Sequence, residues 1–383
     1  MKLLGGVKTI SLVGVAFTCV SILLVSSVHA APSKKDLSDL IFESSSIEQS
    51  VTQGGNTRGP ALALLSDDTV ILGGGRSGGE VFIWKPTSKN IIRTGSFIPS
   101  TRRMIDSRFA INDIAVLSES ASSARLLISY PRLNASRSCV EIAVDELALD
   151  RNRERARFVA QWFVSKPCVP VSAVQHTAGR FEVIDKNSVY LTVGDLGFTR
   201  IGDRKKRGDL GSVFKLTART AEKISQGHRN PQGIVLYNND TLMVSEHGPR
   251  GGDELNIVKK GNDYGWPFVT YGQPYGAGDY VKPTKTGTHE GFVKPITYWV
   301  PSIAPTELVQ LPNQGWGDWN SALVLGTLRE EVLVFIALNQ KLEVTSTQQI
   351  DVGQRVRDLD VLSDGSLIMS TDAGNLITAS KKS

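Results

Sequence analysis

The sequence predicts an all-β protein, specifically a six-bladed β-propeller. Three observations support this prediction. Few stretches of the 383 residues show helical periodicity. What recurs instead is an apolar strand, a polar turn, a second strand, a glycine-marked turn and a further strand. This pattern occurs six times along the chain, and small antiparallel sheets repeated every roughly 40–60 residues are typical of propellers.

The six units follow one another in order, and most place Asp or Asn in a tight turn between two β-rich runs. They begin at Ala61, Asn112, Arg180, Gly233, Ser321 and Arg357. Two stacked β-sandwiches are the alternative, but they would not explain one repeat across the whole chain after the first 30 residues. We therefore expect residues 31–383 to form a single propeller domain whose functional loops gather on one face.

The N-terminus is typical of a targeting segment. Lys2 and Lys8 precede an apolar run over residues 10–28, and a small-x-small pattern ends at Ala30. We expect residues 1–30 to be a cleaved signal peptide and the mature chain to be periplasmic or secreted. An uncleaved N-terminal anchor is the alternative. No other segment is long and apolar enough to span a membrane, so we expect no membrane span in the mature chain.

Charge and cysteine usage exclude some functions. The formal charge of +5 is modest, and the basic residues form no stripe with interleaved aromatics, which argues against nucleic acid as a partner. Beyond the leader only Cys139 and Cys168 remain. In an oxidising compartment they are a natural disulfide pair, the alternative being two separate buried thiols. No C-x-x-C pair is present, so any redox chemistry requires another cofactor.

Residues 246–267, EHGPRGGDELNIVKKGNDYGWP, form an unusual loop. Five glycines and two prolines fit neither a helix nor a central strand. Gly248 and Pro249 leave backbone carbonyls free to turn inward, while Asp253 and Glu254 supply carboxylate oxygens. Backbone and carboxylate oxygens together suit Ca²⁺. The alternative is a glycine-rich turn that is closed by its own carboxylates.

This loop carries a family resemblance. GHRNPQG (residues 227–233), EHGPRGGDELN and NDYGWP, in this order, resemble the aldose sugar dehydrogenases that depend on pyrroloquinoline quinone (PQQ), the family of soluble glucose dehydrogenase and sorbosone dehydrogenase. HTAGR (176–180), TVGDLG (192–197) and QRVRDLDVLSDGSL (354–367) agree with it. The resemblance covers the chain from about residue 170 onward. The family is a six-bladed propeller, in agreement with the six repeats.

The resemblance implies roles for three residues in catalysis. His176 would be the general base that takes the hydroxyl proton of the substrate as hydride leaves the same carbon. Asp195, one strand pair later, would orient the imidazole. Arg229 would lie beside the reactive quinone oxygens and stabilise the reduced, anionic form.

The resemblance also implies binding sites for PQQ and Ca²⁺. PQQ carries three carboxylates, and the residues that would meet the cofactor are Arg229, Asn230, Arg329, Arg355 and Arg357. Arg329 stands where the family has a lysine. Arg355 and Arg357 share one face of a predicted strand and so require an anion, unless the strand is a solvated edge. The carbonyls of Gly248 and Pro249 would bind the Ca²⁺ that touches PQQ, and Glu254 with the Tyr264 carbonyl would hold a structural Ca²⁺.

Together these features predict an exported dehydrogenase that oxidises an aldose at its anomeric carbon and passes electrons to a quinone or cytochrome. The early glutamine of the family, in a GQ-x-G-L-L stretch, has no match in SRFAIND (107–113). A non-catalytic propeller of this family that binds a partner or glycan is therefore an alternative. A metal-dependent lactonase would need several carboxylates converging on one metal near the axis, and the sequence indicates no such set.

Overall fold

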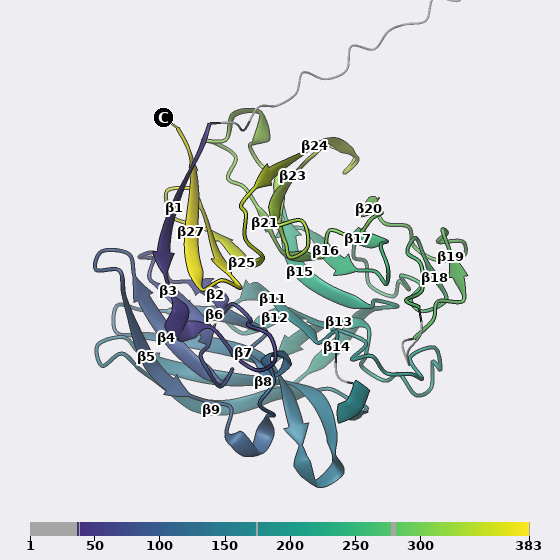
Figure 1. Cartoon of the computed structure of the whole chain (residues 1–383), viewed down its shortest axis with the longest axis horizontal. Coiled ribbons are helices and arrows are strands. Elements are labelled where there is room, and N and C mark those ends of the chain that lie inside the picture. Colours follow the sequence, from purple (N-terminus) through teal and green to yellow (C-terminus); the bar gives the residue numbers. More distant parts are fainter. Residues whose placement is uncertain (1–36, 38, 174, 277–280, 383) are drawn as a thin grey trace, which may run out of the picture. The chain divides into compact units, whose positions relative to one another are not determined.

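The computed structural model describes residues 37, 39–173, 175–276 and 281–382, and the expected signal peptide lies outside them. Strands make up 52% of the structure, which has almost no helix. No helix in the described part of the chain is long and apolar enough to cross a membrane. The prediction of a six-bladed β-propeller is confirmed (Figure 1).

Each blade is an antiparallel sheet, and in the first five blades the strands follow chain order. The first blade contains β2 (Ala61–Leu64), β3 (Val70–Gly74), β4 (Glu80–Lys85) and β5 (Asn90–Ser96). The second contains β6 (Asp113–Glu119), β7 (Ser123–Asn134) and β8 (Cys139–Asp150), and both β9 (Arg155–Val164) and β10 (Val169–Pro170) pair with β8. The third contains β11 (Ala178–Asp185), β12 (Ser188–Val193), β13 (Ser212–Thr217) and β14 (Ala221–Gln226), and the fourth contains β15 (Asn230–Tyr237), β16 (Thr241–His247), β17 (Asp253–Ile257) and β20 (Thr297–Trp299).

The fifth and sixth blades complete the ring. They comprise β21 (Pro305–Gln310), β22 (Leu323–Thr327), β23 (Val332–Leu338) and β24 (Val344–Asp351); and β25 (Val356–Val361), β26 (Leu367–Thr371), β27 (Asn375–Lys381) and β1 (Leu40–Ser46). β1 pairs antiparallel with β27, from Leu40 opposite Lys381 to Ser46 opposite Asn375. The sixth blade thus joins the two ends of the described chain in one sheet, and its innermost strand contacts that of the first blade to close the ring.

Short elements connect the blades. A small parallel pair, β18 (Val269–Thr270) and β19 (Lys285–Thr286), lies in the long connection of the fourth blade. Single 3₁₀ turns occur at η1 (Glu48–Ser50), η2 (Ser100–Arg102), η3 (Ser107–Phe109), η4 (Ala135–Arg137), η5 (Val171–Ala173) and η6 (Gly317–Trp319).

Apolar side chains fill the spaces between neighbouring blades. Successive residues of a strand point to opposite faces. Accordingly, Leu126 of β7 packs in the cluster shared with the first blade, and Leu127 packs in the cluster shared with the third. Both are fully buried. Because both faces of a blade are covered, central strands such as β23, VLVFIAL, are apolar throughout.

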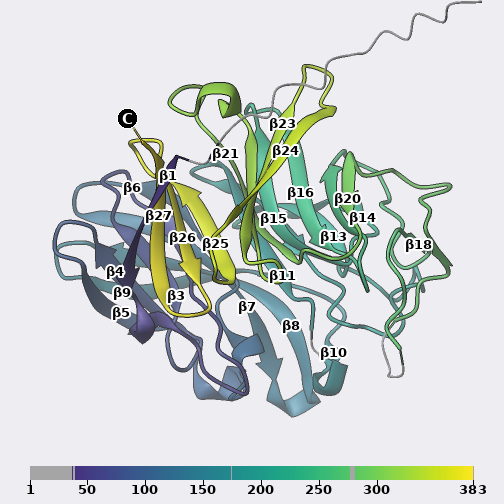
Figure 2. The same cartoon turned by 45° about the horizontal axis from the view of Figure 1, so that its top comes forward.

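The innermost strands place the functional residues. β2, β6, β11, β15, β21 and β25 are first in their blades and contact each other in sequence around the axis (Figures 1 and 2). Their starting ends therefore meet on one face, together with the loops that join the second and third strand of each blade. We call this the cofactor face, and it carries every site residue considered below.

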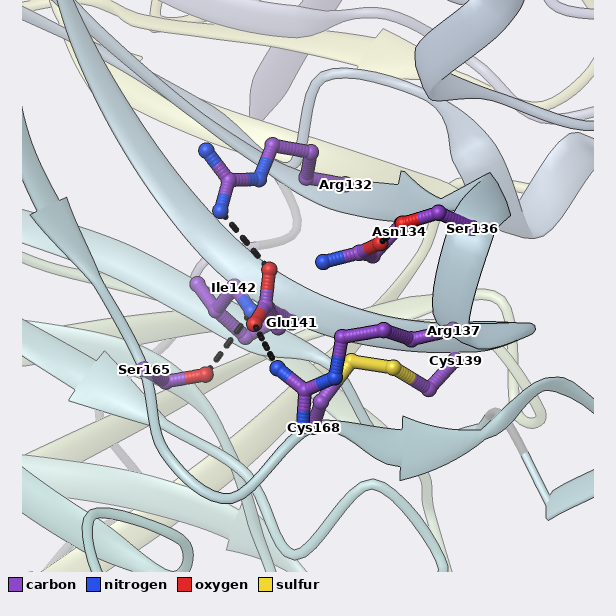
Figure 3. Close-up of a disulfide and its surroundings, with 9 residues drawn as sticks. All are labelled: Arg132, Asn134, Ser136, Arg137, Cys139, Glu141, Ile142, Ser165 and Cys168. Atoms are coloured by element: carbon purple, nitrogen blue, oxygen red, sulfur yellow. Dashed lines mark hydrogen bonds and ion pairs between the residues drawn. A yellow bond between two sulfur atoms is a disulfide. The ribbon is translucent and has the colours of Figure 1, made fainter.

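The predicted disulfide between Cys139 and Cys168 is confirmed, with 5.5 Å between the Cα atoms (Figure 3). Cys139 opens β8, and Cys168 directly precedes β10, whose Pro170 lies opposite Cys139. Nearby, Glu141 accepts a hydrogen bond from Arg132 Nη2 at 2.7 Å. The disulfide thus fastens the short strand β10 and the start of the following loop to the end of the long β7–β8 hairpin.

Candidate active site

His176 and Asp195 form a hydrogen-bonded pair on the cofactor face. His176 lies just before β11 and Asp195 just after β12, and the His176 Nδ1 atom is 2.8 Å from Asp195 Oδ1. Both His176 and the nearby Ala178 have a positive φ, of 52° each, which is uncommon for residues other than glycine. Gly194 permits this loop, since a Cβ there would collide with the His176 carbonyl oxygen.

Asp195 is held as a carboxylate. It is fully buried and also accepts hydrogen bonds from the Gly197 backbone N–H at 2.7 Å and from Trp266 Nε1 at 2.8 Å. Burial by itself would raise the pKa of Asp195, but the charge and hydrogen bond of His176 bring that pKa below its ordinary value. An ionised Asp195 accepts the Nδ1 proton of His176, which leaves the lone pair of a neutral imidazole on Nε2.

Arg229 faces that lone pair. Its Nη2 atom lies 3.0 Å from His176 Nε2, and its Nη1 donates to the Gly248 carbonyl at 2.5 Å. The guanidinium stacks near Trp266, 5.4 Å from the ring centroid. Burial, and secondly the charge of Arg229, lower the pKa of His176, while Asp195 opposes the change. The pair thus favours a neutral imidazole with a free Nε2.

The positive charge of Arg229 is not balanced by an ion pair. No carboxylate pairs with its guanidinium in the described part of the chain. Its Nε atom is buried and has no hydrogen-bond partner in the same residues. Leaving a buried donor unpaired costs roughly 1–3 kcal/mol, so this position suits an anionic ligand.

The loop after β16 brings the expected metal ligands together. Gly248, Pro249, Glu254 and Tyr264 all line one small cavity of about 10 Å³, which has room for about one ion or water molecule. The Pro249 carbonyl accepts a hydrogen bond from Tyr275 Oη at 3.1 Å. Sequence reasoning expected two separate metal positions, whereas in the structure both ligand sets border the same space.

The two carboxylates of this loop have different roles. Asp253 closes the turn by accepting from the backbone N–H groups of Gly248, Ile303 and Ala304 at 2.8–3.0 Å, so it is committed to the loop itself. Glu254 lines the cavity and accepts from His289 Nε2 at 2.6 Å. Burial raises the pKa of Glu254, although the hydrogen bond from His289 opposes this. In the structure Asp253 therefore contacts loop donors, whereas Glu254 is the carboxylate that lines the cavity.

Arg355 and Arg357 already have an anion. Arg357 makes a two-point contact with Asp372, Nε to Oδ1 at 2.9 Å and Nη2 to Oδ2 at 2.8 Å. Arg355 lies one residue before β25 and reaches the same carboxylate at 2.9 Å. The sequence missed Asp372, which follows β26 and returns to the same face. The strand is the innermost one of its blade and an edge of its sheet, and Asp372 supplies the anion that its arginines contact.

The remaining predicted residues lie close by. Asn230 opens β15, is buried, and accepts from Gln232 Nε2 at 2.9 Å. Arg329 follows β22, but its side chain is 59% exposed and lies 3.5 Å from Glu330. The carbonyl of the neighbouring Leu328 accepts a hydrogen bond from Arg355 Nη1 at 3.0 Å, so Arg329 lies at the border of the site. Among the described contacts, none joins its side chain to Arg229 or His176.

A carboxylate cluster also lies on the axis, contrary to expectation. Asp113, Glu307 and Asp358, from β6, β21 and β25, approach one another closely enough to hold a metal ion. However, the buried guanidinium of Arg180 donates to Glu307 and Asp358 and already supplies the positive charge. This arrangement argues against a lactonase metal at that position. The cluster borders a cavity of about 470 Å³ that runs along the later parts of the inner strands.

A six-bladed propeller with a histidine, an aspartate and an arginine assembled on one face defines a class of redox enzymes, and comparison with known proteins agrees. Residues 60–378 match the family model Glucose / Sorbosone dehydrogenase. The chain is 28% identical over 341 residues to aldose sugar dehydrogenase YliI of Escherichia coli K12, covering 84% of this chain and 90% of that protein.

Solved structures share the fold. The apo form of the soluble aldose sugar dehydrogenase of E. coli superposes with a TM-score of 0.73 at 24% identity, covering 89% of this chain and all of that one. The PQQ-bound aldose sugar dehydrogenase of Streptomyces coelicolor gives 0.66 at 20% identity, covering 89% and 99%. This chain belongs to the Glucose / Sorbosone dehydrogenase family, which supports a sugar dehydrogenase.

Proposed function

We propose that this protein is a PQQ- and calcium-dependent dehydrogenase that oxidises an aldose-type sugar at its anomeric carbon. The observation that carries the proposal is the position of His176 between Asp195 and Arg229, where Asp195 would keep the imidazole proton on Nδ1 and Nε2 would be the acceptor. Oxidation of an alcohol by hydride removal requires an unprotonated base to take the hydroxyl proton. A neutral His176 beside Arg229, whose charge has no ion-pair partner among the described residues, would meet this requirement.

The donors on the cofactor face suit PQQ. The buried, unpaired Nε atom of Arg229 and its guanidinium charge fit a quinone whose oxygens gain negative charge on reduction. Arg355 and Arg357 share a single carboxylate, so together they keep a net positive charge for a cofactor carboxylate. Asn230 and Arg329 would complete the set at the edges of the site.

The reaction divides between cofactor and protein. When bound, PQQ supplies the acceptor for the hydride that leaves the anomeric carbon. His176 Nε2 takes the proton of the anomeric hydroxyl, so that the C–H and O–H bonds break and a C=O bond forms, giving a lactone. Asp195 keeps the imidazole in the required tautomer and stabilises the positive charge that it acquires. Trp266 fixes the second oxygen of Asp195.

Calcium would bind at the loop after β16. Gly248 and Pro249 line the small cavity and would contribute their carbonyl oxygens, and Glu254 and the Tyr264 backbone would provide further oxygens. At the Gly248 carbonyl a Ca²⁺ ion would lie beside Arg229, where it would add to the positive charge that meets the cofactor. Both ligand types are those that Ca²⁺ prefers, and the cavity accepts about one ion.

The remaining parts of the proposal concern location and partners. A disulfide between Cys139 and Cys168 is typical of an oxidising compartment, which supports export of the chain after removal of residues 1–30. The electrons would then leave to a quinone or cytochrome acceptor. The absence of the family's early glutamine favours a second candidate, a non-catalytic propeller that binds a partner or glycan.

A spectral titration tests the proposal. Purified protein is titrated with PQQ in the presence of Ca²⁺, and the absorption spectrum is recorded before and after addition of an aldose such as glucose. The expected result is saturable PQQ binding followed by a sugar-dependent change to the spectrum of reduced PQQ. If PQQ does not bind, the non-catalytic candidate replaces this one. If PQQ binds but no aldose reduces it, the assignment to sugar oxidation fails.

A further inference from the structure

Arg58 occupies the place in the first blade that His176 and Arg229 occupy in the third and fourth, just before the innermost strand. The backbone of Arg58 pairs with Thr52 through two hydrogen bonds of 2.9 and 3.0 Å. The next residue, Gly59, donates its N–H to Asp372 at 2.8 Å. A Cβ on Gly59 would lie 3.1 Å from the Arg357 Cβ. Arg58 is therefore fixed beside the Arg357–Asp372 pair.

The guanidinium of Arg58 lacks an anionic partner. Its only described side-chain hydrogen bond runs from Nη2 to the neutral Oδ1 atom of Asn112, at 3.2 Å. Its Nε atom is buried and has no partner in the described residues, and no carboxylate there forms an ion pair with it. Burial, and secondly the charge of Arg357, lower the pKa of Arg58 to about 9. The site thus holds this cation at a cost in free energy.

Asn112 extends the group of unpaired donors toward the base. Its Oδ1 atom accepts from Arg58 and, at 3.1 Å, from the Thr177 hydroxyl, and Thr177 directly follows His176. Its Nδ2 atom is buried and has no partner within the described chain. Asn112 also belongs to residues 107–113, the segment in which the family's early glutamine has no match.

The local charges do not balance. Arg58, Arg355 and Arg357 gather near one carboxylate, Asp372, which is paired with the latter two. Asp358, whose charge also acts on Arg58, forms an ion pair with Arg180. Three guanidinium groups therefore gather around the single carboxylate of Asp372 at this side of the cofactor face. Arg58 is only partly buried as a residue, so a ligand can reach it.

We propose that Arg58 and Asn112 form a carboxylate-binding subsite for PQQ, in place of the early glutamine that this chain lacks. The inference rests on the proposed function. A bound carboxylate would accept hydrogen bonds from the partly exposed guanidinium of Arg58, which Asn112 Oδ1 holds in place through its hydrogen bond with Nη2. The negative charge of that carboxylate would also offset the repulsion between the positive charges of Arg58 and Arg357.

The test compares Arg58→Gln with Arg219→Gln, which removes the same charge from the exposed turn between β13 and β14. Affinity for PQQ is measured by titration in Ca²⁺, and thermal unfolding is measured without PQQ. Arg58→Gln should weaken PQQ binding about 10- to 100-fold, as expected for a lost charge-assisted hydrogen bond. Its unfolding temperature without PQQ should be unchanged or higher, because an unpaired buried charge has been removed. Arg219→Gln should alter neither.

Two results would overturn the inference. If Arg58→Gln binds PQQ like wild type while Arg357→Gln loses affinity, the cofactor is bound but Arg58 does not contact it, and the proposed function stands. If Arg58→Gln lowers the unfolding temperature of the apo-protein and leaves affinity unchanged, Arg58 is structural. Failure of the wild-type protein to bind PQQ would reject the proposed function and this inference together.

Discussion

The protonation of His176 can be measured without any cofactor, and the geometry predicts its response to two substitutions. Arg229 lies 3.0 Å from Nε2 and disfavours the imidazolium, whereas Asp195 lies 2.8 Å from Nδ1 and favours it. Burial and Arg229 together lower the pKa of His176 below the ordinary value of 6.5. Arg229→Gln should therefore raise the titration midpoint, and Asp195→Asn should lower it further.

The size of the change follows from the distances. Two unit charges about 4 Å apart interact by about 1 kcal/mol in bulk water and about 4 kcal/mol at the effective dielectric constant of a protein surface. Since about 1.4 kcal/mol corresponds to a tenfold change in a proton-binding constant, an interaction of this strength is large enough for the removal of Arg229 to move the midpoint measurably upward. Asp195→Asn should produce a downward change of similar size.

Two-dimensional NMR of the histidine ring nitrogens provides the assay. The His176 signals are identified by their absence in His176→Gln, and His289, which contacts Glu254 rather than Arg229, serves as an internal reference. The spectrum should also show the proton on Nδ1 in the neutral state. A wild-type midpoint at or above 6.5, or a downward change in Arg229→Gln, would refute the electrostatic reasoning.

Three further predictions concern the metal, the disulfide and the N-terminus. Chelation with EDTA should lower the melting temperature by about 5 °C if Ca²⁺ saturates its site, and Glu254→Gln should abolish that sensitivity; an unchanged wild-type melt would exclude a stabilising metal. Replacing Cys139 and Cys168 with serine should destabilise the fold by about 3.6 kcal/mol in the chain-entropy model, given the sequence separation of 29, and a denaturant titration that shows no loss would contradict this. Mass spectrometry of periplasmic protein should find a mature chain that begins near Ala31, and recovery of only the intact chain would point to an uncleaved anchor.

The repeat pattern predicted the number of blades but not all of their strands. The fifth blade was expected to begin at Ser321, whereas its innermost strand is β21, Pro305–Gln310. In this strand two buried positions hold polar residues: Thr306, which donates to the Val356 carbonyl, and Glu307, which accepts from Arg180. The strand therefore lacks the apolar alternation by which strands are predicted. The first strand, LIFESSS, completes the sixth blade from the other end of the chain. Local patterns cannot reveal such a pairing.

The residues of the candidate site also fall into those that the sequence could predict and those that it could not. His176, Asp195 and Arg229 could be predicted because the segments that contain them resemble motifs of a known family, and the structure brings the three side chains together. Trp266 and Arg58 could not, because each reaches the site from another blade through contacts between residues distant in sequence. Asp372 could not either, because it meets Arg357 only once β26 pairs with β25. The position of an arginine or asparagine just before an innermost strand is the sequence signal that identifies Arg58 and Asn112 once the strands are known.

The turnover of His176→Gln tests the central claim most directly. With PQQ and Ca²⁺ at saturation and glucose as substrate, dye reduction by this variant is compared with wild type after the PQQ affinity of both has been measured. A general base contributes about 10²–10⁴ in rate, so kcat should fall by about that factor. PQQ affinity should stay close to wild type, since the cofactor carboxylates would meet arginines rather than this imidazole. Near wild-type turnover in His176→Gln would contradict the proposed chemistry.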